Sequence, residues 1–322
     1  MLKYFQAALL LLICTVQCGC STANKRYQNI VSQNVSFPSD VTIENVPIFV
    51  QDEHECGPAA LAMVIAWGGE DGISPEQISP DLFTPSKKGS FQYDLISAAR
   101  RNGKIAYVIP PNPEALFSEL AAGYPVIILQ NLGLSWIPRW HYSVVVGYDS
   151  TNEQFILHSG QKSVQKISFT PFDNTWARSG YWAVVVLPPE KLPSTAESKQ
   201  FLESIHSLEE AGKLEESIKA YDAARNRWPS EASFLLGQAT AYYQRGELLK
   251  SEKLFKEGSR KFPNSQALLN NYAEVLAKRG KLKEALGIAQ KAVGLSGPFH
   301  EISQRTLNSI QDRINKSRSQ VL

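Results

Sequence analysis

The second half of the chain repeats at a fixed interval, and this repeat constrains its fold more than any other feature. Gly212, Gly246 and Gly280 lie 34 residues apart in the 322-residue sequence. Other positions keep the same spacing: Leu214, Leu248 and Leu282; Ser217, Ser251 and Ala285; Pro229 and Pro263. A period of this length is typical of stacked helix pairs, because one pair cannot bury its apolar face without a neighbour. We therefore expect an all-α helical-repeat domain in this half.

These copies resemble the tetratricopeptide repeat. The matching residues are Tyr221 and Ala224 in the first copy, Tyr242, Phe255 and Pro263 in the second, and Tyr272, Ala273, Ala285 and Ala292 in the third. We expect three repeats over residues 196–298, in a domain that a polar closing helix extends to residue 318. The resemblance implies a concave surface for a peptide or protein partner. A spacer or stabilising cap explains so short an array equally well.

A proline-rich segment, residues 188–195, separates this helical half from a region of different composition. Residues 41–187 contain five of the six tryptophans and several β-branched runs, so we expect strands there. At roughly 150 residues for each domain, the length of the chain also allows two domains. We interpret residues 188–195 as the linker between them.

Residues 1–20 are typical of a secretory signal, because Lys3 precedes an apolar run that is too short to span a bilayer. The segment ends in Gly19-Cys20, which resembles the processing box of bacterial lipoproteins, although Gln17 stands where an aliphatic residue is usual. The resemblance implies that the mature protein begins at a lipidated Cys20 in the cell envelope. By the same resemblance, Ser21 in the second position of the mature chain implies sorting to the outer membrane, on its periplasmic side. We expect the polar residues 21–40 to form a flexible tether.

The balance of charge argues against a nucleic-acid partner. The chain has 33 Lys and Arg against 31 Asp and Glu, a net charge of +2, and no long basic run. We expect no cofactor, and we expect contact with a membrane only through the lipid. Three of the four cysteines lie within the first twenty residues, so Cys56 is the sole thiol of the expected folded region.

Cys56 is followed by Gly57-Pro58 and an alanine-rich stretch, a pattern that predicts the start of a helix at this cysteine. The free N–H groups and the positive end of a helix stabilise a thiolate, so we expect a lowered pKa and an ionised thiol. Gln51 lies five residues earlier, at the end of an extended run. From there its amide can turn back and donate to an oxyanion.

A base for this thiol is available in His141, which opens a β-branched run that ends at Gly147. A residue at the start of a strand lies at the edge of a cleft. The next predicted strand ends at His158-Ser159, which lies beside His141 if the two strands form an antiparallel hairpin. We expect the group that orients His141 to come from this strand end.

These motifs resemble the papain-like peptidase family that includes the bacteriocin double-glycine leader peptidases. The resemblance rests on Gln51-x4-Cys56-Gly57-Pro58-Ala59 and on a strand that opens with His141 and closes with Gly147-Tyr148-Asp149. It covers residues 41–187 and implies an α+β papain-like domain, with the nucleophile on an N-terminal helix beside an antiparallel sheet. By this resemblance Cys56 is the nucleophile, His141 is the general base and later the acid, and Gln51 is the oxyanion donor.

The sequence departs from this family at the third catalytic position. Where the family has an aspartate, this chain has His158-Ser159-Gly160. A buried carboxylate holds the imidazole in one tautomer and stabilises the imidazolium, whereas a serine supplies no charge. We expect Ser159 or His158 to orient His141, with Asp149 as a further candidate, and we expect turnover to be slower.

Two functions follow from these observations. The first is a lipid-anchored cysteine peptidase outside the cytoplasm, and the resemblance implies cleavage after small residues such as Gly-Gly. The second is a weakly active or inactive peptidase scaffold that binds peptides, with the repeats as its working surface. Transfer of the acyl group to an amine instead of water is also open.

Two further patterns bear on the site. A zinc site made of Cys56, His54, His141 and His158 is disfavoured, because their spacing lacks a paired-ligand motif. Trp136 and Trp140, just before His141, fit the wall of a substrate groove and the hydrophobic core equally well.

Overall fold

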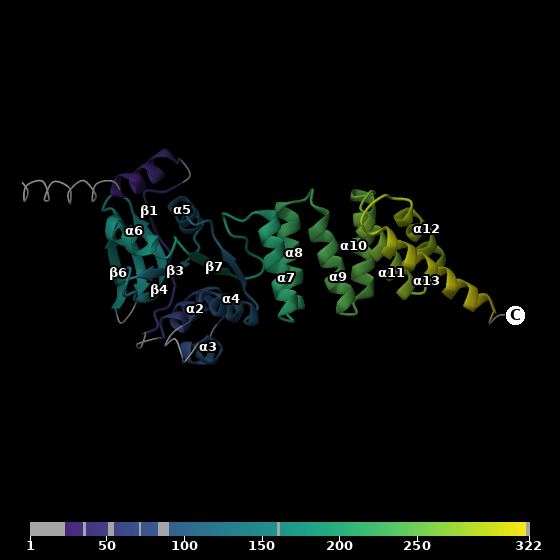
Figure 1. The fold of residues 1–322 in the computed structure, drawn as a ribbon, viewed down its shortest axis with the longest axis horizontal. Helices are drawn as coiled ribbons and strands as arrows, with labels where there is room; N and C mark the ends of the chain where they lie inside the picture. The colour runs from purple at the N-terminus through teal and green to yellow at the C-terminus, as the bar shows by residue number, and fades with distance from the viewer. Residues whose placement is uncertain are drawn as a thin grey trace, which may run out of the picture. The chain divides into compact units, whose positions relative to one another are not determined.

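The computed structural model describes residues 23–34, 37–50, 55–70, 72–82, 90–159 and 162–319. The chain forms two units, one ending at Glu197 and one starting at Ser198 (Figure 1). The predicted signal segment 1–20, with Cys20, lies outside the described residues, as do Gln51 and His54. None of the helices within the described ranges is long and apolar enough to cross a membrane.

The first unit is built on a seven-stranded antiparallel sheet, in the order β2-β7-β3-β4-β5-β6, with β1 paired to β4. The strands are β1 (Asp40–Thr42), β2 (Ile105–Val108), β3 (Val126–Asn131), β4 (Trp140–Asp149), β5 (Gln154–Ser159), β6 (Lys162–Ser168) and β7 (Ala183–Leu187). β-Branched side chains pack well on a pleated surface, and the valine-rich β7 is buried along its whole length. The expected α+β fold with an antiparallel sheet is confirmed, and β4 and β5 form the predicted hairpin.

Helix α2 (Cys56–Trp67) lies inside the first unit. Its residues from Gly57 to Ile65 are all buried, as expected of a helix that is apolar on every side. It packs on β3, β4 and β7, and it also contacts α3 (Pro75–Leu82) and α4 (Gln92–Arg101), which gather around it in Figure 1. Because α2 begins at Cys56, this packing brings the candidate nucleophile to the sheet.

The prediction of a flexible tether over residues 21–40 is wrong for the part that the structure describes. Residues 23–33 form a helix, and its Tyr27 and Val31, one turn apart, are buried. The Tyr27 ring lies 5.9, 5.6 and 5.1 Å from the rings of Phe117, Phe155 and Phe169. These rings belong to α5 (Pro113–Ala121), β5 and α6 (Phe169–Ala177). The polar residues of the segment therefore occupy the solvent side of a packed amphipathic helix.

The predicted linker, residues 188–195, belongs to the first unit and is hydrogen-bonded to it. The carboxylate of Glu119 on α5 accepts hydrogen bonds from the N–H groups of Ser194 and Thr195, at 2.9 and 2.8 Å, and from the Thr195 hydroxyl at 2.6 Å. Tyr107 on β2 donates its O–H to the Thr195 carbonyl at 3.3 Å and accepts the Glu197 N–H at 3.0 Å. These side chains fix the course of the segment up to the last residue of the unit.

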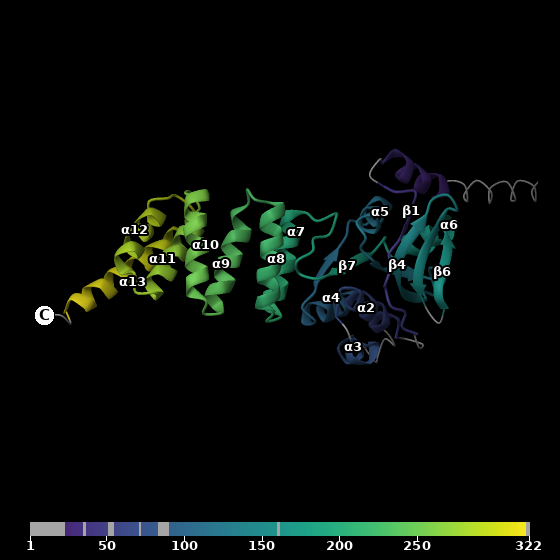
Figure 2. The same ribbon diagram turned by 180° about the vertical axis from the view of Figure 1, so that it is seen from behind.

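The second unit consists of helices that stack in sequence order, as the repeat predicts (Figure 2). They are α7 (Ser198–Glu210), α8 (Leu214–Arg227), α9 (Ala232–Gln244), α10 (Leu248–Lys261), α11 (Gln266–Lys278), α12 (Leu282–Val293) and α13 (His300–Ser319). Gly212, Gly246 and Gly280 lie in the turns between paired helices, at φ values of 75°, 78° and 79°. Glycine is favoured there because it has no Cβ to clash in the left-handed region. Helix α13 is the polar closing helix, and its Leu307 and Ile310 complete the core.

Candidate active site

Cys56 is the first residue of α2, as its Gly-Pro context predicts. The first intrahelical hydrogen bond runs from the Ala59 N–H to the Glu55 carbonyl at 3.1 Å, and Pro58 has no N–H. The N–H groups of Cys56 and Gly57 are therefore free of the helix and face the thiol. Gly57 allows the start of α2 to lie close to Ser90, because a Cβ at position 57 would be only 2.6 Å from the Ser90 hydroxyl oxygen.

The expectation of an ionised thiol is wrong. Burial raises the pKa of Cys56 above its ordinary value of 9.0, and the backbone N–H groups of Tyr142, Gly57 and Cys56 lower it by less. A thiolate at this position loses its hydration, and three partial charges do not replace it. In the resting protein Cys56 is therefore a neutral thiol at neutral pH.

The backbone of Tyr142 connects the thiol to the imidazole. The Tyr142 N–H that faces the Cys56 sulfur belongs to the peptide bond that joins His141 to Tyr142. Leu129, which pairs with Tyr142 across β3 and β4, donates its own N–H to Trp182 at 3.3 Å. The Leu129–Tyr142 pair is therefore not hydrogen-bonded, and the Tyr142 N–H points away from β3, toward the side where β5 pairs. The Cys56 thiol therefore lies on the β5 side of β4, next to the backbone of the residue that follows His141.

His141 is the second residue of β4 and is half-buried. Its Nε2 atom lies 2.8 Å from the Ser159 hydroxyl oxygen at the end of β5, so the structure brings together His141 and one of the three predicted orienting residues. Burial, and to a smaller extent the charge of Arg139, lower the pKa of His141 to about 4. The imidazole is neutral at neutral pH, in the state that accepts a proton.

Ser159 continues into a line of neutral side chains that sequence reasoning missed. The hydroxyl oxygens of Ser159 and Ser143 lie 3.1 Å apart, and Ser143 Oγ lies 3.2 Å from Gln130 Oε1. Gln130 Nε2 donates to the Thr175 hydroxyl on α6 at 2.7 Å. The available signal was the strand period of two, which puts Ser143 on the same face of β4 as His141. Gln130 and Thr175 join this line only through the tertiary structure.

The other two predicted orienting residues do not contact His141. His158 pairs with Val144, and its ring donates to the Pro47 carbonyl, because successive strand residues point to opposite faces. Its Nδ1 is buried and has no hydrogen-bond partner among the residues that the structure describes, and burial lowers the pKa of His158. Asp149 is the last residue of β4, at the opposite end from His141, and accepts hydrogen bonds from Asn152. Both candidates are corrected in favour of Ser159.

Comparison with known families finds one match in each unit. Residues 43–184 match the model of the Peptidase_C39 like family. The first unit is similar to a C39-like peptidase domain over these residues. A tetratricopeptide-repeat model matches residues 202–264 and 238–298, which confirms the interpretation of the second unit. No curated protein matches the chain.

Solved structures with similar parts include a putative C39-like peptidase from Bacillus anthracis, with 19% identity and a TM-score of 0.40, over 46% of this chain and 97% of that chain. The helical unit is similar to the type III secretion translocator chaperone SycD of Yersinia enterocolitica, with 21% identity, a TM-score of 0.33 and coverage of 36% and 92%. The tetratricopeptide domain of Sgt2 from Aspergillus fumigatus has 17% identity, a TM-score of 0.36 and coverage of 39% and 83%.

An ordered hairpin with an apolar surface leads into the site of the C39-like domain. Leu134 and Ile137 bridge its two sides, and the Asn131 side chain accepts the N–H groups of Gly133 and Arg139, both at 2.9 Å. Its exposed apolar residues, which we call the apolar hairpin, are Leu132, Leu134, Trp136, Ile137 and Trp140. Trp136 is 75% exposed and Trp140 50%, so of the two alternatives left open for them the hydrophobic core is excluded. A hydrogen-bonded hairpin that exposes this much apolar surface next to His141 in the sequence is a candidate wall of a substrate groove.

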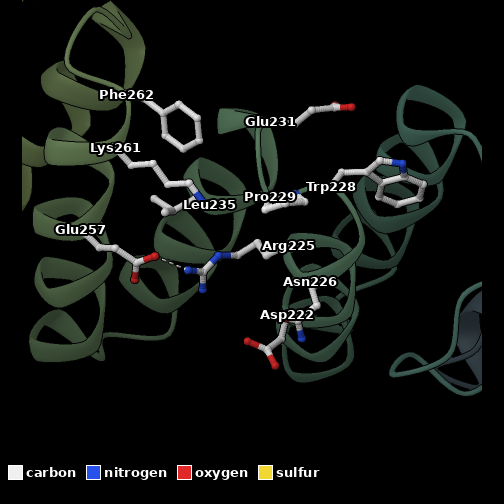
Figure 3. A pocket seen from close by; sticks show the side chains of 10 residues that line it. All are labelled: Asp222, Arg225, Asn226, Trp228, Pro229, Glu231, Leu235, Glu257, Lys261 and Phe262. Carbon is white, nitrogen blue, oxygen red and sulfur yellow. Dashed lines mark hydrogen bonds and ion pairs between the residues drawn. The ribbon is translucent and has the colours of Figure 1, made fainter.

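The tetratricopeptide unit has a pocket of about 380 Å³ (Figure 3). Trp228 and Phe262, which are 34 residues apart, both line it. Arg225 is already occupied, since it donates to Gln238 and to Glu257 at 2.6 Å each. The remaining lining residues add Lys261 and several carboxylates, so the pocket has mixed charge.

Proposed function

We propose that this protein is a cysteine peptidase in which Cys56 is the nucleophile and His141 is the general base. One observation carries the proposal: the Cys56 sulfur meets the peptide N–H that follows His141, while Ser159 holds the His141 ring at 2.8 Å. Nucleophilic catalysis needs a thiol and a neutral base within reach of each other, and the shared peptide bond together with the oriented ring supports this pairing. The match to the Peptidase_C39 like family over residues 43–184 supports the same reaction class.

The reaction begins when the thiol proton passes to His141 and Sγ bonds to the carbonyl carbon of the substrate. The carbonyl oxygen becomes an oxyanion, for which the N–H groups of Cys56 and Gly57 are available donors. Gln51, outside the described residues, is proposed as a further donor. The C–N bond then breaks, and His141 returns its proton to the leaving amine. Water, deprotonated by His141, attacks the thioester carbon, the C–S bond breaks, and the sulfur regains a proton.

The proposed substrate is a polypeptide whose bulky apolar side chains pack on the apolar hairpin. Trp136 and Trp140 offer rigid aromatic surface at a low entropic cost of ordering. The resemblance to double-glycine leader peptidases implies small residues at the cleaved bond itself. We propose in addition that the tetratricopeptide unit binds a protein partner, with the pocket between Trp228 and Phe262 as the contact site.

The test is cleavage of a peptide library by the full chain and by single variants. We expect cleavage by the natural protein, and its loss in both Cys56→Ala and His141→Ala. His206→Ala is a matched control, because His206 is exposed on α7 and belongs to the other unit. Equal cleavage by the Cys56→Ala protein would end the proposal. The products also report whether small residues flank the cleaved bond.

We also propose that the protein is exported and anchored by lipid at Cys20, on the periplasmic side of an outer membrane. The support is the Gly19-Cys20-Ser21 motif after a short apolar run. The test is fractionation of cells that express the natural chain or Cys20→Ala. We expect the natural protein in the membrane fraction and the variant outside it; equal distribution of the two contradicts the proposal.

A further inference from the structure

We propose that Gln130, Ser143 and Thr175 are positioning residues that fix His141 in the tautomer with hydrogen on Nε2 and a lone pair on Nδ1. Together with Ser159 they form a one-directional relay of hydrogen bonds, which begins at His141 and ends at the backbone of α6. Its consequence for catalysis rests on the proposed function, but the tautomer itself is a property of the folded protein.

The direction of the relay is set at Thr175. Its Oγ lies 2.9 Å from the Phe172 carbonyl oxygen and 3.2 Å from the Pro171 carbonyl oxygen. A carbonyl only accepts, so the single hydrogen of the Thr175 hydroxyl is used on these two oxygens. Toward Gln130, 2.7 Å away, Thr175 can therefore act only as an acceptor. The amide nitrogen of Gln130 must face α6.

This orientation of the Gln130 amide decides what happens at Ser143. With Nε2 directed to Thr175, Oε1 faces the Ser143 hydroxyl at 3.2 Å. The Ser143 hydroxyl also has a single hydrogen, which it donates to Oε1. Both residues are enclosed, with 2% of Gln130 and none of Ser143 exposed. Water cannot take over these contacts, and an unpaired group here would cost free energy.

The last two steps reach the imidazole. The Ser143 hydroxyl lies within donating distance of both Ser159 Oγ at 3.1 Å and Gln130 Oε1 at 3.2 Å, and it has one hydrogen. With this hydrogen on Oε1, for which the described residues offer no other donor, Ser143 accepts from Ser159. Ser159 has then used its own hydrogen and accepts from His141 Nε2 at 2.8 Å. His141 must therefore carry its hydrogen on Nε2. The lone pair of Nδ1, the ring nitrogen nearer the backbone, is left to take the proton of the thiol at the Tyr142 N–H.

The relay fulfils one of the two roles of a catalytic carboxylate. A carboxylate both orients the ring and stabilises the imidazolium with its charge. The relay orients through neutral groups alone, so it selects the tautomer and leaves the imidazolium without a counter-charge.

The test uses Thr175→Val, which keeps the shape of the side chain and removes its acceptor. Gln130 Nε2 then finds its remaining acceptor in Ser143, so the amide turns over and the relay reverses. We expect ¹⁵N NMR of the ring nitrogens to report Nε2–H at His141 in the parent protein and a shift to Nδ1–H in the variant. The parent carries Cys56→Ala, so the measurement is independent of turnover. His141→Gln assigns the signal.

Ser179→Ala is the matched control, because Ser179 donates to a backbone carbonyl near the end of α6 but lies outside the relay. Ser143→Ala, which interrupts the relay at its centre, serves if Thr175→Val does not fold. We expect the ring nitrogens of His141 to respond to either interruption and not to Ser179→Ala. A parent protein with Nδ1–H as the main tautomer, or a tautomer unchanged in the folded variants, overturns the proposal.

In the protein with Cys56 intact, we expect Thr175→Val to lower kcat about tenfold or more with KM unchanged, since Nδ1–H cannot accept the thiol proton. If the tautomer shifts but the natural chain has no peptidase activity, the relay is supported and the proposed function is contradicted. A kcat that stays unchanged while the tautomer shifts would overturn the role of the relay in catalysis.

Discussion

Ser159 Oγ lies 2.8 Å from His141 Nε2, so the candidate base of this C39-like domain is oriented by a hydroxyl group and not by a carboxylate. A neutral partner leaves the effect of burial on the imidazole uncompensated, and the pKa of His141 falls to about 4. The thiol pKa moves in the opposite direction, because Cys56 is buried as well. The resting pair is therefore neutral, and charge separates only during the reaction.

Replacing this hydroxyl with a carboxylate is expected to activate the site. In Ser159→Asp the negative charge faces His141 Nε2, stabilises the imidazolium and raises the pKa of His141 from about 4 toward its ordinary 6.5. We expect kcat to increase about tenfold. NMR titration of His141 measures the pKa, and peptide cleavage measures kcat. Ser159→Asn is the control of equal shape without charge, and a rise in that variant too would assign the effect to geometry.

The low pKa of His141 predicts a loss of stability in acid. The unfolded chain takes up a proton at this residue near pH 6.5, whereas the folded protein does so only near pH 4. The unfolding free energy is therefore unaffected by the titration of His141 above pH 6.5. It falls by up to about 3 kcal/mol as the pH decreases from 6.5 to about 4, because protonation of His141 favours the unfolded chain. Urea unfolding of the natural protein and of His141→Gln measures it. A difference between the two that does not change over this pH range contradicts the prediction.

The alkylation of Cys56 is expected to have an alkaline midpoint. Because burial raises its pKa above 9.0, the rate of labelling by iodoacetamide should still be rising at pH 9 in the folded protein. The same cysteine in the urea-unfolded chain is the reference, since its thiol is hydrated. Mass spectrometry of the peptide that contains Cys56 separates it from the other cysteines. If the pH midpoint of labelling is lower in the folded protein than in the unfolded chain, the prediction is contradicted and Cys56 is an ionised thiol.

The carboxylate of Glu119 is expected to hold the segment that ends the first unit. In Glu119→Gln, one oxygen is replaced by an NH₂ group that faces the N–H of Ser194 or Thr195, donor against donor. We expect the unfolding free energy to fall by about 1–3 kcal/mol and cleavage by trypsin after the exposed Lys191 to become faster. Glu114→Gln, exposed on the same helix, is the control. Equal trypsin rates in the two variants refute the role of Glu119.

The apolar hairpin is expected to contribute to substrate binding. In Trp136→Ala we expect KM for an apolar peptide to rise about tenfold, which corresponds to about 1.4 kcal/mol of lost binding, with kcat unchanged. Trp136 is exposed, so its removal leaves no cavity in the core. Leu249→Ala removes a similarly exposed apolar residue from α10 in the other unit and should leave KM as it is. A loss of kcat without a change in KM contradicts this role.

The sequence alone determined the features that depend on local pattern. The 34-residue spacing of Gly212, Gly246 and Gly280 identified the helical repeats, because the same left-handed turn recurs in each copy. The Gly-Pro after Cys56 identified a helix start, since proline fits the first turn of a helix. The β-branched run after His141 identified a strand and placed Ser159 at the end of its neighbour. Each of these signals is contained within a short stretch of chain.

Only the tertiary structure decided the features that depend on burial and on long-range contact. The polar composition of residues 23–33 hid a buried face, because Tyr27 is covered by rings from residues 117–169. The pKa of Cys56 rises although it starts a helix, because its loss of hydration depends on the sheet packed against it. Gln130 and Thr175 are 45 residues apart, and their hydrogen bond exists only where α6 covers β3. Local sequence pattern identifies the candidate reacting groups. Their protonation depends on burial and on contacts with residues that are far away in the sequence.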